Sequence, residues 1–408
     1  MVQVARGVHW LRMPVAFAPG HVNLWAIEDE AGDDVDNGPC WTLVDAGFPD
    51  DATRANWTAA LTGDLAGRPV RRILITHCHP DHFGLGEWLA KQTGARIWMS
   101  LGEYMTAQAW FGTVPASDRN LMADFFVLHG LGAGHTDAMR SESGRYRQVV
   151  GELPVAMRRI LPGETLRIGG DDWTAIAGYG HSPEHLSFHR ANDPVLIAGD
   201  MLLPRISPNT PTLAYEPEVD AVGQYLDSIE LFRALPDHTV VLPAHGDPYV
   251  GIAARVDALQ AHHAERLALI VSLCAEPQTA AALLPSLFKR KLDSFQTRFA
   301  MGEVIAHLNH LWQTGRLRRL PKLLRFIPGT AQDVRAYFLT LQYWLAGSQD
   351  NVANMVRFLI DRYADGPRAS LRGKLEAGAP VEYPEVGVYH PRMPGRMSEL
   401  PNTLPAIN

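Results

Sequence analysis

The stretch that decides the fold reads Thr76-His77-Cys78-His79-Pro80-Asp81-His82-Phe83-Gly84. It follows the apolar run Arg72-Ile73-Leu74-Ile75, whose branched side chains are typical of a buried strand. We therefore expect the motif on the loop at the carboxyl end of that strand, where α/β proteins place their chemistry. Imidazoles and carboxylates are preferred ligands of zinc and similar divalent metals. Four such residues within six positions predict a metal site rather than a polar loop with incidental histidines.

This H-x-H-x-D-H array resembles the metal motif of the metallo-β-lactamase-fold hydrolases. That family also needs a later histidine, a bridging aspartate and a last histidine, each at a strand end. His181, Asp200 and His245 stand in this order, and the last two directly follow apolar runs. The resemblance covers about residues 5–250. It implies an α/β fold, an αβ/βα sandwich with a one- or two-metal site at the sheet edge.

The resemblance also implies how the ligands are shared between two metals. The first metal would bind His77, His79 and His181, the second would bind Asp81, His82 and His245, and Asp200 would bridge both. The complete set implies two divalent ions, Zn²⁺ by preference with Fe or Mn as alternatives, and a bridging hydroxide as nucleophile. A divalent cation lowers the pKa of its water from 15.7 to about 7. Asp81 and Asp200 are the candidate catalytic residues, with Asp81 or the released hydroxide equivalent managing the proton.

The reaction that we expect from this centre is hydrolysis of a small ester, thioester or lactone. Three alternatives stay open. The first is endoribonuclease or phosphodiesterase activity, and the second is iron-dependent dioxygenation of a thiol or persulfide, which uses much the same histidines around one metal. The third is a metal-binding transcription factor, which the intact ligand set disfavours. β-Lactam hydrolysis is also disfavoured, because no export signal is visible.

Composition narrows the class of protein. The 408 residues are 46% hydrophobic and 20% charged, which describes an ordinary globular protein of two or three domains. A net charge of -7 argues mildly against a nucleic-acid or anionic-membrane surface, so we expect a small-molecule substrate. The three scattered cysteines, Cys40, Cys78 and Cys274, predict a reducing, cytoplasmic location. No apolar run is long enough to span a bilayer.

Several residues near the motif allow two interpretations. Asp45 ends a predicted strand, and either orients a metal ligand, as in the resembled family, or only forms a turn. Cys78 is expected to pack away from the metals as a small apolar residue. His185 is close to His181, but the resemblance assigns the ligand to the first of the two.

Elements of the metal domain can be predicted from periodicity and turn residues. We expect strands at 7–13, 22–27, 41–45, 165–168, 173–177 and 239–245, and helices at 51–62, 83–93 and within 215–235. Between His82 and His181, helices at 103–111, 118–129 and 141–149 form an insertion that we expect to cover the metal site and shape the substrate pocket. His129 and His135 in this insertion are expected to be ordinary surface or core residues.

The chain is expected to divide into a metal domain (1–251), a second domain (252–320) and an extension (321–408). Helices at 253–274, 279–288 and 294–314 end at a capping Gly315 and resemble a winged-helix module. Such modules suggest nucleic-acid binding. Because the chain is acidic, we favour packing or homodimerisation instead.

The extension resembles an internal piece of the large, porphyrin-binding chain of magnesium chelatase. The similar stretches are 326–347, 350–366 and 381–391, with helices predicted at 337–345 and 352–363 and an extended segment at 379–394. A piece this short does not carry the porphyrin site of the parent protein, so we expect no porphyrin function. The extension could have arisen by a fusion, from a misassembled reading frame or as a captured segment, and its sequence does not separate these origins. Truncation after Arg319 is expected to leave metal content and turnover nearly intact.

Overall fold

The first of two stacked sheets carries the motif strand. The computed structural model describes residues 1–17, 19–30, 38–112, 121–141, 145–321 and 385–391. The strands of this sheet lie in chain order: β1 (Val2–Ala5), β2 (Val8–Pro14), β3 (His21–Asp29), β4 (Cys40–Val44), β5 (Val70–Leu74), β6 (Arg96–Met99) and β7 (Arg158–Arg159). Pairs from β1 to β4 are antiparallel, and those from β4 to β7 are parallel. The predicted meander is confirmed, whereas β1, β6 and β7 were not predicted.

The second sheet carries the later ligands at its strand ends. Its spatial order is β12-β11-β10-β9-β8, formed by β8 (Thr165–Ile168), β9 (Asp171–Gly178), β10 (His185–Arg190), β11 (Val195–Gly199) and β12 (Val240–Pro243). Only β11 and β12 pair in parallel. β10 was not predicted, although its sequence, His-Leu-Ser-Phe-His-Arg, has the alternation of polar and apolar residues that is typical of a strand. All six of its residues are buried.

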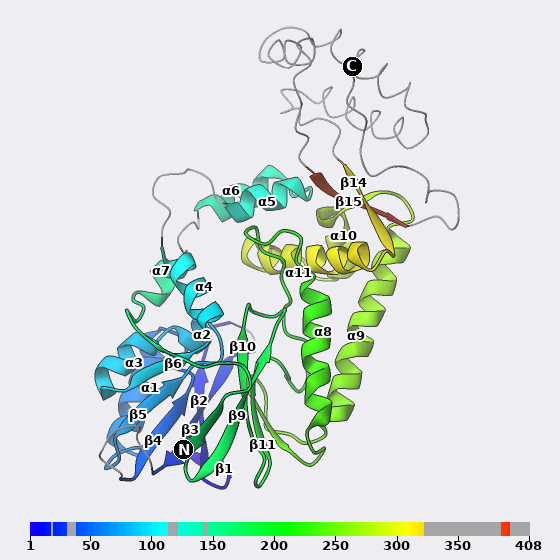
Figure 1. The fold of residues 1–408 in the computed structure, drawn as a ribbon. Helices are drawn as coiled ribbons and strands as arrows, with labels where there is room; N and C mark the ends of the chain where they lie inside the picture. Colours follow the sequence, from blue (N-terminus) through cyan, green and yellow to red (C-terminus); the bar gives the residue numbers. More distant parts are fainter. Residues whose placement is uncertain (18, 31–37, 113–120, 142–144, 322–384, 392–408) are drawn as a thin grey trace, which may run out of the picture.

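The two sheets pack face to face and helices cover both outer faces (Figure 1). The central core joins Trp25 of the first sheet to Trp173 and Phe188 of the second. Outside the first sheet lie α1 (Asp51–Thr62) and α3 (Gly86–Thr93), and outside the second lie α8 (Ala221–Leu231), the 3-10 turn Phe232–Ala234 and α9 (Ile252–Leu273). Each fully buried large apolar side chain stabilises this arrangement by about 1.5–3 kcal/mol. The αβ/βα sandwich is confirmed.

The predicted helix at 83–93 is observed as α3, and the helical turn before it was not predicted. A single turn, α2 (Pro80–Phe83), precedes α3. The chain breaks at Leu85, because its amide donates to the carbonyl oxygen of Gly47 (3.2 Å) and its side chain is fully buried. Asp81 and His82 therefore lie on a helical turn rather than on an open loop.

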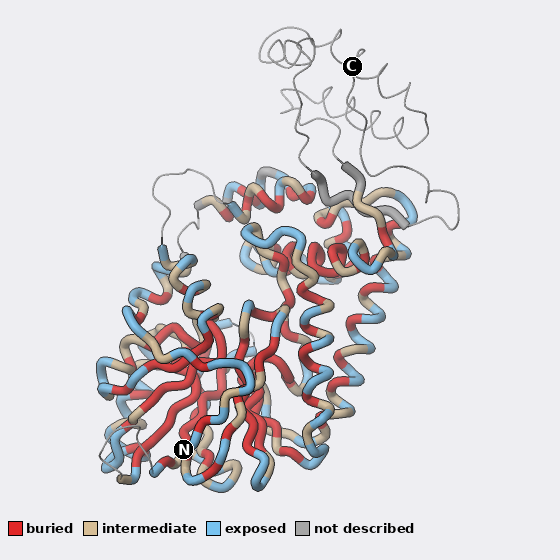
Figure 2. Tube along the Cα trace, viewed as in Figure 1, coloured by how far each residue is buried: buried red, intermediate tan, exposed pale blue. Residues whose placement is uncertain are grey.

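A layer of helices lies above the sandwich (Figure 1). It contains the C-terminal part of α9, α10 (Ala280–Leu287) and α11 (Ser294–Gln313), close to the three predicted helices, and α5 (Leu121–Leu128) and α6 (Ala133–Ser141) of the insertion. Figure 2 shows that much of α11 is buried. Its buried residues include Met301, Ile305 and Leu308. The rest of the insertion, α4 (Leu101–Phe111) and α7 (Arg145–Val150), packs beside the sandwich. Among the described helices none is both long and apolar enough to cross a membrane.

A small third sheet involves the extension. β15 (Glu385–Pro391) pairs antiparallel between β13 (Gln278–Thr279) and β14 (Leu317–Pro321). This strand lies within the predicted extended segment 379–394. The helices predicted at 337–345 and 352–363 lie outside the described residues. The extension therefore contributes a strand to the sheet of the preceding module, which a purely independent tail would not do.

Candidate metal centre

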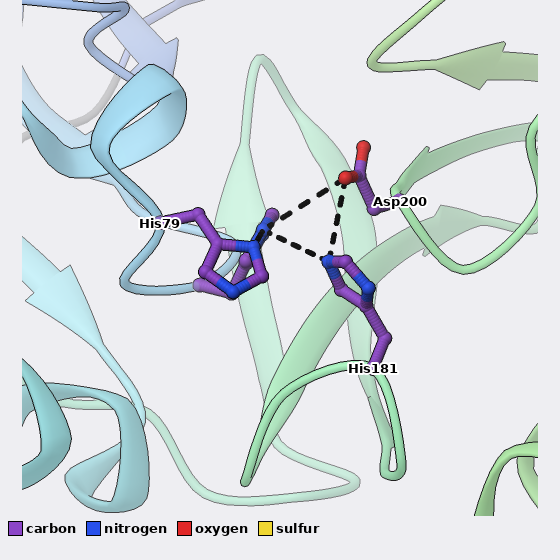
Figure 3. Close-up of side chains that lie close together, drawn as sticks. His79, His181 and Asp200 are labelled. Carbon is purple, nitrogen blue, oxygen red and sulfur yellow. Dashed lines mark hydrogen bonds and ion pairs between the residues drawn. The ribbon is translucent and has the colours of Figure 1, made fainter. Parts of the chain in front are cut away.

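Seven predicted ligands converge at one edge of the sandwich. Two groups have ligand atoms within 4.8 Å of one another, namely His77, His79, His181 and Asp200, and Asp81, His82 and His245. They follow β5, lie on α2, or follow β9, β11 and β12. Figure 3 shows His79, His181 and Asp200 pointing toward one another from separate loops. We call the three histidines 77, 79 and 181 the first half-site, and Asp81, His82 and His245 the second half-site.

In the first half-site the imidazole nitrogens face a common point. His77 Nε2 lies 2.9 Å from His79 Nδ1 and 3.3 Å from His181 Nε2. Asp200 Oδ2 lies 3.3 Å from His181 Nε2 and 4.0 Å from His77 Nε2. Three ring nitrogens and one carboxylate oxygen are the donor set of a four-coordinate zinc site.

In the second half-site the other oxygen of the same carboxylate takes part. Asp200 Oδ1 lies 3.5 Å from His245 Nε2 and 3.7 Å from His82 Nε2. Asp81 Oδ2 lies 3.4 Å from His245 Nε2 and 3.8 Å from His82 Nε2. Asp200 thus presents one oxygen to each half-site, which is the arrangement of a bridging ligand.

Two buried atoms of the centre have no hydrogen-bond partner among the described residues. These are His82 Nε2 and Asp200 Oδ1. A buried polar atom without a partner costs about 1–3 kcal/mol, so native proteins rarely leave one. Both atoms point at the second half-site, where a cation would satisfy them. The donor set and these two atoms together fit the binding of divalent metal.

The far nitrogen of four imidazoles is held by the protein. The pairs are His77 Nδ1 with Thr76 Oγ1 at 3.0 Å, His82 Nδ1 with Asp45 Oδ2 at 2.8 Å, His181 Nδ1 with the Asn209 carbonyl oxygen at 2.7 Å, and His245 Nδ1 with the His21 carbonyl oxygen at 2.7 Å. Donation from Nδ1 leaves Nε2 free of a proton and directed at the metal position. Contacts of this kind orient metal-binding histidines and raise their basicity.

Asp45 is more than a turn residue. One of its oxygens accepts from the backbone amide of Thr76 (2.8 Å), and the other accepts from His82 (2.8 Å). Its backbone is left-handed (φ 65°), a conformation that aspartate adopts more readily than most residues. The structure therefore supports the interpretation in which Asp45 orients a metal ligand.

The second half-site favours positive charge. Burial alone would lower the pKa of His82, but the carboxylates of Asp81, Asp45 and Asp200 outweigh it and raise that pKa to about 10. Burial would raise the pKa of Asp81, but His82 and His245 lower it to about 2. Ionised carboxylates are the form that binds metal, and a metal ion can supply the positive charge in place of a proton.

In the first half-site, His77 and His79 favour the neutral form. Burial, reinforced by neighbouring histidines, lowers the pKa of His79 to about 3 and that of His77 well below its usual value. Neutral imidazole is the form that coordinates a metal. The two half-sites thus have opposite electrostatic character.

Other residues singled out from the sequence lie elsewhere or act indirectly. Cys78 is fully buried in the core of the first sheet, as predicted. His185 opens β10 and accepts the backbone amide of Asp200 at Nε2 (3.2 Å), so it supports a ligand. Buried His129 contacts Phe125 in the helical layer. No signal in the sequence pointed to Glu103, Asn209 or Trp110, which contact the metal loops.

The chain belongs to the metallo-beta-lactamase superfamily, whose profile matches residues 19–245. A second profile, described as the metallo-beta-lactamase-like C-terminal domain, matches residues 267–328. The winged-helix assignment stays a prediction for this second region.

Two solved structures are similar over most of the chain. A beta-lactamase domain protein from Burkholderia ambifaria is 41% identical, with a TM-score of 0.72, over 78% of this chain and 90% of that one. A metallo-beta-lactamase family protein from Thermus thermophilus is 28% identical, with a TM-score of 0.65, over 78% of this chain and 97% of that one.

The extension has a different relative. A profile described as CobN/Magnesium Chelatase matches residues 341–407. The corresponding magnesium-chelatase chain from Rhodobacter capsulatus is 57% identical over 93 residues, which are 23% of this chain. The matched region spans only 8% of that protein's length, so the likeness concerns a small fragment.

Proposed function

We propose that this chain is a hydrolase with two divalent metal ions, zinc by preference, that cleaves a small ester, thioester or lactone. The observation that carries the proposal is the division of the Asp200 carboxylate between two ligand groups, with Oδ2 on the first half-site and Oδ1 on the second. A one-metal thiol or persulfide dioxygenase has no use for a complete second half-site. The second group of ligands therefore supports hydrolysis over dioxygenation.

Divalent ions held by the two half-sites and Asp200 would supply an activated water at neutral pH and would polarise a substrate oxygen. The side chains around them then orient the centre and handle protons. Asp200 fixes the separation of the two half-sites. Asp81 is the residue that we propose to manage the proton, and its carboxylate is 14% exposed. No nucleophilic side chain is required.

The surroundings of the centre favour an acyl substrate over a nucleic acid. The ring of Trp110 stacks on His79 (centroids 6.1 Å apart) and meets Tyr146 edge to face. This aromatic wall beside a metal ligand suits an apolar acyl group. On the side of the second half-site, the guanidinium of Arg12 is already paired with Asp247 (2.7 Å). A nuclease would need cationic side chains available for several phosphates.

We further propose the division into domains 1–251, 252–320 and 321–408, with the middle domain packing on the metal domain rather than binding nucleic acid. The bonds of Asn309 Nδ2 to the carbonyl oxygens of Pro217 (3.0 Å) and Val219 (3.2 Å) support this packing role. A cytoplasmic location and a homodimer stay proposals. The buried free thiols Cys40, Cys78 and Cys274 support the reducing compartment.

The proposal can be tested by metal analysis together with a substrate panel. The purified chain, loaded with Zn²⁺, should hold about two ions and hydrolyse members of a thioester, ester and lactone panel with weak dependence on salt. RNA and a phosphodiester complete the panel. A nuclease would lose affinity steeply between about 50 and 200 mM salt. Salt-sensitive RNA cleavage without any acyl hydrolysis would overturn the substrate class, and a metal-free active protein would overturn the whole proposal.

A further inference from the structure

A buried carboxylate that no metal ligand role accounts for lies beside the centre. Glu103 is on α4, in the insertion, and is fully buried. Its Oε2 accepts the backbone amide of Cys78 (2.9 Å), and its Oε1 accepts both the hydroxyl of Ser182 and the backbone amide of Glu184 (2.7 Å each). Three hydrogen bonds thus converge on one side chain.

Those three donors belong to two different ligand loops. Cys78 lies between the ligands His77 and His79, while Ser182 directly follows the ligand His181. Glu103 is therefore bonded on one side to the loop after β5 and on the other to the loop after β9. All three ligands that it spans belong to the first half-site.

Two further hydrogen bonds join the start of α4 to the loop after β9, and in these the donors belong to the α4 side. Glu184 Oε2 accepts the backbone amide of Gly102 (2.7 Å), and its carbonyl oxygen accepts the hydroxyl of Ser100 (2.8 Å). A Cβ at Gly102 would come within 2.8 Å of the Glu184 Cβ, so glycine is needed for this close approach. Glu103 and Glu184 thus form a reciprocal clamp between α4 and the loop of His181.

The energetics favour a role beyond local packing. Removing an ionised carboxylate from water is costly, and only charge-assisted hydrogen bonds of good geometry offset the cost. Any change in the spacing of the two loops would break one of these bonds, so the carboxylate resists that change.

We propose that Glu103 is a positioning residue that sets the spacing and metal affinity of the first half-site and leaves the second unaffected. This inference rests on the proposed metal centre. The geometry specifies an informative substitution, Glu103→Gln. The amide oxygen can keep both bonds made by Oε1, whereas the amide nitrogen must face the Cys78 amide, where two donors oppose each other. The loop of His77 and His79 therefore loses its anchor while the side-chain volume is preserved.

The experiment compares this substitution in two backgrounds. His245→Ala removes a ligand of the second half-site, and His79→Ala removes a ligand of the first. Zn²⁺ affinity is measured by competition with a chromophoric chelator, and Co²⁺ absorbance reports the ligand geometry. Loss of an outer contact costs about 10–100-fold in metal affinity. We expect that loss for Glu103→Gln in the His245→Ala background and no more than about twofold in the His79→Ala background, as for independent sites.

Asp29→Asn is the matched control. Asp29 is another buried carboxylate, paired with Arg72 (2.6 Å) at the carboxyl end of β3, and its substitution should lower thermal stability without a difference between backgrounds. If Glu103→Gln is insoluble, Ser182→Ala removes one of the three donors and should show a smaller loss with the same asymmetry. Equal changes in both backgrounds, or none, would contradict the positioning role. An unmodified chain that binds no divalent ion would instead refute the proposed function.

Discussion

The two half-sites differ in what holds them in place. The second is supported from within the sandwich, since His82 bonds to Asp45 at the end of β4 and His245 bonds to the carbonyl oxygen of His21 at the start of β3. In the first, His77 bonds within the sandwich to Thr76 Oγ1, but other supports lie outside the two sheets. His181 bonds to Asn209 on the long loop after β11, and Glu103 on the insertion joins the loops that carry its histidines.

Among these supports, the loop that contains Asn209 connects the helical layer to the first half-site. Asn209 Nδ2 donates to Glu303 Oε2 on α11 (3.1 Å), and the amide of Thr212 on the same loop donates to the carbonyl oxygen of Gly302 (3.0 Å). A displacement of α11 would therefore move the loop that contains Asn209 and, through this loop, the ring of His181. The second half-site has the sheet framework as its support, so the first is the position that variation in the added domains can adjust.

The largest expected effect comes from removing the ligand that both half-sites share. Asp200→Ala should reduce the metal content from about two ions to one or fewer, and should abolish turnover, because the carboxylate contributes an oxygen to each half-site. Elemental analysis and hydrolysis of the preferred acyl substrate measure the two quantities. Retention of both ions by a folded variant would show that Asp200 does not bridge.

A change in Asp45 should separate the half-sites. Asp45→Asn keeps the side-chain shape and tolerates the left-handed backbone, but opposes an amide nitrogen to one of its donors. We expect a loss of about 10–100-fold in metal affinity at the second half-site and a smaller loss at the first, because Asp45 also accepts from Thr76, whose hydroxyl contacts His77. Asp193→Asn is a close control, because Asp193 is also left-handed (φ 54°) but lies in the turn between β10 and β11. An equal loss at both half-sites would contradict the comparison.

The ligands were predictable because each stands at a strand end beside a local signal. His77 follows an apolar run, and Asp200 and His245 each close another. The parts that were missed lack such signals. Glu103 is the one acidic residue of a largely apolar helix, and only folding brings it to loops 25 and 79 positions away. β10 has the alternation of polar and apolar residues of a half-exposed strand, but it is buried on both faces.

The strand pairing of the extension was likewise not predictable from local sequence patterns. Its sequence resembles an unrelated protein, and this predicted an independent tail. Pairing of β15 with β13 and β14 depends on contacts between segments more than 60 residues apart in the chain, which periodicity does not reveal. The expectation that truncation after Arg319 spares metal binding still stands as a prediction, but the truncated module would lose the central strand of its small sheet.

Two buried histidines in the helical layer should make the free energy of unfolding fall in acid. His263 on α9 and His307 on α11 are buried, with His263 Nδ1 3.1 Å from His307 Nε2. Burial is the main cause that lowers the pKa of His263 to about 3. The neighbouring charges that add to it are those of His307, His262, Arg266 and His310. Burial lowers the pKa of His307 to about 4.

The unfolded chain binds protons at these imidazoles near pH 6.5, while the folded chain does so only near pH 4 and 3. The unfolded state therefore binds more protons in this window, and the free energy of unfolding should fall as pH decreases from 6.5. The loss is on the order of 3 kcal/mol per imidazole by pH 4.5. Denaturant unfolding at several pH values measures it. His263→Asn should flatten the curve, and exposed His238→Asn should not; equal curves would contradict the assignment.

The smallest effect should come from weakening the link between α11 and the first half-site. Asn209→Ala removes the bonds to Glu303 Oε2 and to the Phe299 carbonyl oxygen, but leaves the Asn209 carbonyl oxygen to accept from His181.

Because the Thr212 bond to Gly302 still holds this loop, the loss is that of roughly one hydrogen bond, about 1 kcal/mol, or about fivefold in metal affinity. It should be seen in the His245→Ala background, which keeps the first half-site, and not in the His79→Ala background. Asn192→Ala, which removes a similar bond to Asp171 at the other end of the second sheet, should change neither. A shift of the second half-site alone would mean that α11 acts on the centre by another route, and that the first half-site is not the adjustable one.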